Sequence, residues 1–315
     1  MLQWIQRAGL TAAVVASTLL AGCWGGDSDD PKNIVEIAQD NPDLSILVEA
    51  VVAADLTSTL SADGTLTVFA PTNDAFNALF TELGVTKDAL FADKALLTSV
   101  LTYHVLGTQV KAAGIPVGQP ITTLQGGYFK IDGTPLAITD GRNRVSSITE
   151  TDIDASNGVI HVVDKVLLPP DKTVVGTAAA LAAADPPEFT LLVEALQVTD
   201  LDATLNGTGP FTVFAPTDAA FADLLTELGL TKDELFADTA LLSSVLTYHV
   251  VPALVLKADV PVGAAITTVQ GGTFTVDGSL QITDTQARAS QITATDVLAS
   301  NGVIHVVDKV LLPAL

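Results

Sequence analysis

Apolar and polar positions alternate with two different periods along residues 33–169. A short apolar run at 66–70, ended by Pro71, predicts a strand, because proline cannot continue a hydrogen-bonded ladder. Thr72 is the expected N-cap of a helix that Gly84 ends. The apolar residues of this helix recur at helical spacing: Phe76, Leu79, Phe80 and Leu83.

Two more helices are expected before the pattern changes to period two. One begins near Thr86 and the next near Asp93, and the second carries an apolar stripe that runs up to His104. Beyond it, residues 128–131 and 136–139 flank an Asp-Gly turn, which predicts a β-hairpin.

Two final strands are expected at 148–153 and 159–168, on either side of a turn at 156–158. Asn157 and Asn301, each followed by glycine, are interpreted as tight-turn residues at which a positive φ is tolerated. Helices and strands therefore mix within one unit, as in the α+β class.

The whole pattern occurs twice. The run ASNGVIHVVDKVLLP occupies residues 155–169 and returns unchanged at 299–313. TVFAPTNDAF at 67–76 likewise returns as TVFAPTDAAF at 212–221. Because the offset between the copies is the length of a domain, the repeat indicates two duplicated domains and not a solenoid.

The first residues have the pattern of an export signal. Arg7 precedes an apolar stretch that is too short to span a membrane and that ends in Leu20-Ala21-Gly22-Cys23. These four residues resemble the lipobox of bacterial lipoproteins, which implies lipidation of Cys23, the only cysteine; an ordinary signal peptide is the alternative.

The predicted organisation follows from the signal and the repeat. It comprises a lipoprotein signal peptide at 1–22, a flexible acidic tether at 23–32, a first domain at 33–169, a linker at 170–172 and a second domain at 173–315. Trp24 stands where an Asp would favour retention in the inner membrane. We therefore expect a lipid-anchored envelope protein at the outer membrane or cell surface, with a secreted or periplasmic form as the alternative.

The charge balance excludes one class of partner. The chain has 36 Asp and Glu against 14 Lys and Arg, a net charge of −22. Nucleic acid binding needs a concentrated basic patch, so nucleic acid is excluded, and contact with the membrane is expected through the lipid anchor only. The acidity is explained either by solubility or a salty habitat, or by divalent cations that bridge the protein to anionic glycans.

The sequence offers few residues in patterns typical of catalysis or metal binding. The four histidines, His104, His161, His249 and His305, all lie in repeated motifs, without the short spacing or the cysteines of a zinc site. A nucleophile elbow, a phosphate loop, an HExxH run and a dinucleotide fingerprint are all missing. We therefore expect no enzyme, no metal site and no cofactor.

The same polar residues have a structural interpretation. His104 ends an apolar helical stripe, where an imidazole can bond backbone groups that the helix leaves unpaired. His161 alternates with valines on one face of its strand, and Asp164 lies on the other face; His305 and Asp308 repeat these positions. Buried groups of this kind must be hydrogen-bonded, so they are expected to fix strand register and packing.

Three motifs together resemble the fasciclin domain family: TVFAPTNDAF or TVFAPTDAAF, the Tyr-His pair, and the Asn-Gly-x-Ile-His-x-Val-Asp run. Each occurs in both copies. The resemblance implies two tandem fasciclin-type domains, each a wedge-shaped β-sandwich with a cluster of helices, used for adhesion and matrix contacts. In animal relatives a Tyr-His motif has been proposed to recognise receptors, so Tyr103-His104 and Tyr248-His249 are either an adhesion motif or part of the core.

Three functions are open from the sequence. The first is a non-catalytic adhesion module that binds an extracellular protein, matrix or glycan, with two copies raising avidity. The second is a structural envelope protein that acts by self-association. The third is a small-ligand carrier or hydrolase, which would need a deep pocket joining His104 and His161 to a Ser or Asp.

Overall fold

The computed structural model describes residues 31–314. The predicted signal peptide, Cys23 and nearly all of the predicted tether lie outside the described residues. Within the described range, none of the helices has both the length and the apolar character needed to cross a membrane. Lys32–Leu315 forms one compact unit that contains both repeats.

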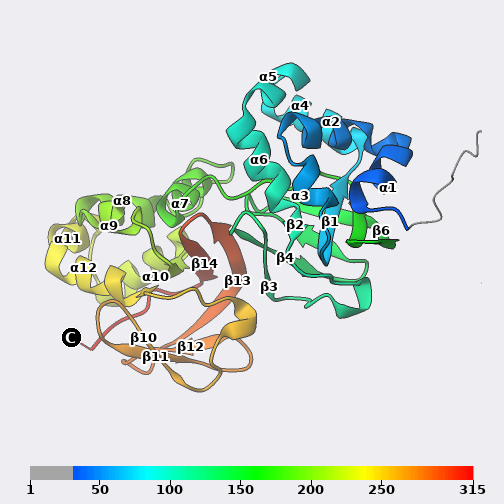
Figure 1. The fold of residues 1–315 in the computed structure, drawn as a ribbon. Helices are drawn as coiled ribbons and strands as arrows, with labels where there is room; N and C mark the ends of the chain where they lie inside the picture. Colours follow the sequence, from blue (N-terminus) through cyan, green and yellow to red (C-terminus); the bar gives the residue numbers. More distant parts are fainter. Residues whose placement is uncertain (1–30, 315) are drawn as a thin grey trace, which may run out of the picture. The chain divides into compact units, whose positions relative to one another are not determined.

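The first repeat contains six α-helices and seven strands (Figure 1). The helices are α1 (Ile34–Asp40), α2 (Ser45–Ala53), α3 (Thr57–Ser61), α4 (Asn73–Leu83), α5 (Lys87–Ala92) and α6 (Lys94–Tyr103), with short 3₁₀ turns η1 (Pro42–Leu44) and η2 (Ala112–Gly114). The strands are β1 (Leu66–Pro71), β2 (Val105–Leu106), β3 (Pro120–Thr122), β4 (Tyr128–Asp132), β5 (Ala137–Thr139), β6 (Val145–Ala155) and β7 (Gly158–Val163).

The second repeat has the same α-helices and strands in the same order, without a counterpart of η1. Its helices are α7 (Val174–Ala182), α8 (Thr190–Val198), α9 (Leu201–Leu205), α10 (Asp218–Leu228), α11 (Lys232–Ala237) and α12 (Thr239–Tyr248), with η3 (Lys257–Asp259). Its strands are β8 (Phe211–Pro216), β9 (Val250–Val251), β10 (Ala265–Thr267), β11 (Thr273–Val276), β12 (Gln281–Thr283), β13 (Ala289–Ala299) and β14 (Gly302–Val307).

Each repeat forms one seven-stranded sheet. The order in the first is β2-β1-β7-β6-β5-β4-β3, and the second has the equivalent order β9-β8-β14-β13-β12-β11-β10. All neighbours pair antiparallel except β1 with β7 and β8 with β14, which are parallel. The predicted α+β fold class, two domains that each combine a sandwich-like sheet with helices, is confirmed.

Local sequence explains where the central elements begin and end. The Thr72 hydroxyl accepts a hydrogen bond from the backbone N–H of Ala75, which caps α4 as expected. Gly84 takes the left-handed conformation, with φ of 64°, and ends the helix. Thr86 and Asp93 cap α5 and α6 in the same way.

The two central strands are buried on both faces. On one face, Val68 and Ile160 pack against the helices, which gather on one side of the strands in Figure 1. On the other face, Phe69 and Val163 join a second core with Phe129 of β4. Because β7 lies between two layers, it is a continuous apolar run interrupted by a single histidine.

The strand predicted at 159–168 is wrong at its C-terminal end, because β7 ends at Val163. The Asp164 carboxylate accepts a hydrogen bond from the backbone N–H of Ser147 at 2.7 Å, and the chain bends there. Beyond the bend, the backbone N–H of Leu167 donates to a histidine at the end of α6 instead of to a strand. Beyond Val163, side-chain acceptors therefore bond backbone N–H groups in place of a neighbouring strand.

Candidate functional site

His161 lies in the middle of β7 and is fully buried. Its Nδ1 accepts a hydrogen bond from the backbone N–H of Asp152 at 3.2 Å, and its Nε2–H donates to the carbonyl of Val110 at 2.9 Å. A backbone N–H can only donate, so this arrangement assigns the ring proton to Nε2 and makes the imidazole neutral. Both nitrogens are engaged within the domain.

His305 repeats this arrangement in the second domain. Its Nδ1 accepts from the backbone N–H of Asp296 at 3.3 Å, and its Nε2–H donates to the carbonyl of Val255 at 2.8 Å. Burial lowers the pKa of His305 below the ordinary histidine value. The ring is therefore held neutral.

His104 joins the end of α6 to the segment after β7. Its Nδ1–H donates to the carbonyl of Val100, one turn back, at 2.7 Å, and its Nε2 accepts from the backbone N–H of Leu167 at 2.8 Å. Burial lowers the pKa of His104 to about 4. The second domain repeats these contacts and this pKa with His249, Val245 and Leu311.

The tyrosine of each Tyr-His pair is fully buried. The Tyr103 hydroxyl donates to the carbonyl of Tyr128 at 2.6 Å, and the Tyr248 hydroxyl donates to the carbonyl of Thr273 at 2.7 Å. Burial raises the pKa of Tyr103 well above its ordinary value. A partner could contact these rings only after β4 or β11 separated from the core.

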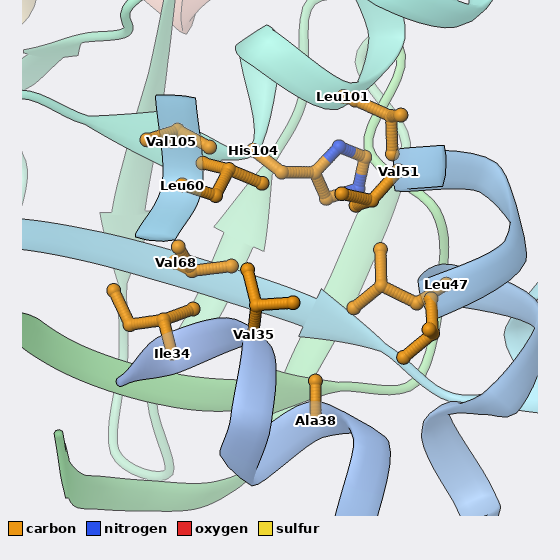
Figure 2. A pocket seen from close by; sticks show the side chains of 11 residues that line it. Ile34, Val35, Ala38, Leu47, Val51, Leu60, Val68, Leu101, His104 and Val105 are labelled. Atoms are coloured by element: carbon orange, nitrogen blue, oxygen red, sulfur yellow. The ribbon is translucent and has the colours of Figure 1, made fainter. Parts of the chain in front are cut away.

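An apolar cavity of about 30 Å³ lies beside His104 in the helical layer. Figure 2 shows the imidazole among aliphatic side chains from α1, α2, α3 and β1, including Val51 and Leu60. The space is about that of one water molecule, and both nitrogens of the only polar lining residue are already bonded. The cavity does not join His104 to His161, a Ser or an Asp, as a hydrolase or carrier would require.

Asn157 connects three segments through its side chain. Its Oδ1 accepts from the backbone N–H of Ile34 at 3.0 Å, and its Nδ2 donates to the carbonyls of Leu60 and Ala62 at 2.8 and 2.9 Å. The predicted tight turns are present at residues 156–157 and 300–301, but neither Asn157 nor Asn301 is among the positive-φ residues. The same three bonds recur around Asn301 with Val174, Leu205 and Gly207.

Asp164 and Asp308 are exposed residues that fasten the ends of their hairpins. Asp164 accepts from the hydroxyl of Ser146 at 3.0 Å, and Asp308 accepts from the hydroxyl of Ser290 at 3.2 Å. In each carboxylate, Oδ1 accepts these bonds and a backbone N–H from its own domain, so one oxygen of each joins the two strands of its hairpin.

A buried carboxylate was missed by the sequence interpretation. Asp140 accepts from the backbone N–H groups of Arg142, Arg144 and Leu168, and its Oδ2 binds the Arg144 guanidinium at 2.7 Å. Asp284 has the same place in the second domain and accepts from the backbone N–H of Arg288 at 2.9 Å, but the Arg288 guanidinium lies 4.0 Å from its Oδ2. The signal was an Asp-x-x-x-Arg spacing present in both copies.

The polar residues of the motifs do not converge on one point. Across residues 31–314, no group of three or more His, Cys, Asp or Glu side chains could hold a metal ion. The conserved geometry of the two copies consists of internal hydrogen bonds that join helices, strands and loops.

Comparison with known proteins identifies the family. The fasciclin domain matches residues 42–169 and 187–313, so the chain belongs to the fasciclin domain family. It is 44% identical over 146 residues to protein sll1483 of Synechocystis. This match covers 45% of this chain and 77% of that protein. It is 28% identical over 256 residues to the transforming growth factor-beta-induced protein ig-h3 of Sus scrofa.

The ig-h3 match covers 81% of this chain but only 35% of that protein, so the chain spans about a third of the length of this relative. Among solved structures, a FAS1 domain pair from the insect cell adhesion molecule fasciclin I matches 88% of this chain and 95% of that chain. The TM-score is 0.43 and the sequence identity is 20%.

Proposed function

We propose that the chain is a non-catalytic adhesion module of the cell envelope, which binds an extracellular protein, matrix or glycan through the surfaces of its two fasciclin domains. The observation that carries the proposal is that every ring nitrogen of the four motif histidines has a partner inside its own domain. General bases and metal ligands need a nitrogen free for substrate or metal.

Family membership supports the same function. The motif resemblance links fasciclin domains to adhesion and matrix contacts, and the chain carries two of them. Two domains on one chain allow bivalent engagement, which raises avidity without new contact chemistry.

We propose further that Cys23 carries the lipid anchor, which would hold the domains at the outer membrane or cell surface. The support is the lipobox-like Leu20-Ala21-Gly22-Cys23 and the presence of no other cysteine in the chain. Labelled fatty acid is expected in the full-length protein and not in Cys23→Ser. Label retained by Cys23→Ser would refute the anchor and leave the adhesion proposal standing.

An adhesion assay tests the function itself. Cells that produce the protein are expected to bind surfaces coated with matrix protein or acidic glycan better than cells from which its gene is deleted. Purified protein carrying Cys23→Ser serves as a soluble competitor and should reduce binding of the producing cells. Equal adhesion with and without the gene would overturn the proposal.

A further inference from the structure

Residues of the first domain contact the second domain inside the compact unit. The Tyr128 hydroxyl donates to the carbonyl of Gly302 at 3.0 Å. Its ring packs on a buried apolar cluster of the second domain formed by Leu256, Leu298 and Val303. Burial raises the pKa of Tyr128 to about 12. An aromatic ring with a bonded hydroxyl in an apolar seat is the usual form of an interface anchor.

Two further contacts surround this anchor. The Asn143 side chain forms a two-way pair with the backbone of Leu298, with Nδ2 donating to the carbonyl at 3.0 Å and Oδ1 accepting from the N–H at 2.7 Å. Lys130 lies 3.4 Å from the carboxylate of Asp296, whose side chain is 2% exposed. Leu298 of β13 lies opposite Val303 of β14 in the sheet, and both of its backbone groups bond an amide from the other domain.

The residues that dock from the first domain are missing from the second. At the equivalent repeat positions, Tyr128 is replaced by Thr273, Lys130 by Thr275 and Asn143 by Ala287. Thr273 and Ala287 are exposed. The second domain therefore has no anchor with which to dock on a further fasciclin domain.

The apolar cluster of the second domain on which Tyr128 packs is likewise missing from the first domain. Where the second domain has Leu256 and Leu298, the first has Lys111 and Asp154, which form an exposed ion pair at 2.8 Å. Docking an aromatic ring there would desolvate both charges. The repeats are alike in their internal hydrogen bonds and differ at both sides of the junction.

We propose that this junction holds the two domains as one unit. We propose also that the differences between the repeats at these positions keep either domain from forming the same junction with a further fasciclin domain. If every domain carried both faces of this head-to-tail interface, further copies could add and form rings or open filaments. The charged face of the first domain and the truncated face of the second prevent this, so the partner for which each junction face is built is the other domain of the same chain.

Removing the anchor tests the first half of the proposal. Tyr128→Thr with Asn143→Ala introduces the residues of the second repeat, at positions on the surface of the first domain. We expect a larger radius of gyration in solution X-ray scattering and separation of the two domains' unfolding transitions in calorimetry. Thr273→Ala is the matched control and should alter neither. A double variant with the wild-type radius and transitions would overturn the proposal.

Rebuilding both faces tests the second half. Lys111→Leu and Asp154→Leu give the first domain an apolar seat, and Thr273→Tyr and Ala287→Asn give the second an anchor. The fourfold variant is expected to associate with rising concentration in sedimentation velocity, whereas each pair of changes alone should stay at the wild-type sedimentation coefficient. A fourfold variant that sediments like the wild type would show that these positions are not what prevents further domains from docking.

Discussion

Phe69 and His161 lie opposite each other on the parallel strands β1 and β7, with ring centroids 5.4 Å apart. Phe214 and His305 repeat the relationship at 5.3 Å. A histidine in this place is packed against an aromatic ring on one side and bonded to two backbone groups at its edges. Its position explains why the motif keeps a polar residue in an apolar strand.

Replacing this histidine should weaken the fold before it affects binding. In His161→Ala, the N–H of Asp152 and the carbonyl of Val110 lose their partner, at a cost of about 1–3 kcal/mol. We expect a lower Tm by calorimetry, with adhesion unchanged at temperatures where the variant is folded. Lys165→Ala, an exposed change in the same motif, is the control. Loss of binding at an unchanged Tm would instead place His161 in a binding site.

Stability should fall in mild acid because of His104 and His249. Their folded pKa values are lowered to about 4, so below the unfolded value of 6.5 the unfolded chain takes up protons that the folded chain does not. The contribution of these two rings to the free energy of unfolding is thus fully present above pH 6.5. It declines toward pH 4, by up to about 3 kcal/mol for each ring.

Urea titrations between pH 4 and pH 8 measure this decline. His104→Gln with His249→Gln should be less stable than the wild type at neutral pH but should lose less stability on acidification, because the titrating groups are gone. Parallel pH profiles for the two proteins would contradict the assignment.

The buried carboxylates should differ between the domains. Asp140→Asn removes a charge that binds the Arg144 guanidinium at 2.7 Å, at a cost of about 2 kcal/mol. Asp284→Asn should cost less, because the Arg288 guanidinium approaches that carboxylate only to 4.0 Å. Chemical denaturation of the two variants measures the difference. Equal losses would show that the backbone N–H donors, and not the arginines, account for the stability.

The glycine that begins β7 should not accept a side chain. A Cβ on Gly158 would lie 2.0 Å from the carbonyl oxygen of Leu66 in β1, and on Gly302 it would lie 2.0 Å from that of Phe211. Gly158→Ala should therefore destabilise the first domain by about 3 kcal/mol or more, since the parallel strands would have to separate. Gly107→Ala, where no atom lies within 4 Å, is the control, and similar melting of the two variants would contradict the argument.

Elements with strong local signals were predictable from the sequence. The caps Thr72, Thr86 and Asp93 and the stop at Gly84 mark three helices correctly, because capping depends on residues within one turn. The helices α1, α2 and α3 were not predicted. They are five to nine residues long and depend on packing against β1 and β7 more than on their own periodicity.

Long-range pairing was beyond the local pattern. The placement of β1 between β2 and β7 joins residues nearly a domain length apart, and nothing adjacent to 66–71 specifies it. The Asn-Gly pair correctly predicted a turn, but the bonds of the Asn157 side chain were not predicted, because its partners lie more than ninety residues away. Asp140 was missed because its arginine partner becomes apparent only by comparison of the two copies.

The bond from the Ile34 N–H to Asn157 also determines when the first domain can finish folding during synthesis. Since Asn157 lies 123 residues after Ile34, α1 lacks this partner until almost the whole first domain has been synthesised. The second domain repeats the dependence with Val174 and Asn301, 127 residues apart. Each domain therefore completes only when its own last strand arrives, and the first can finish while the second is still being translated.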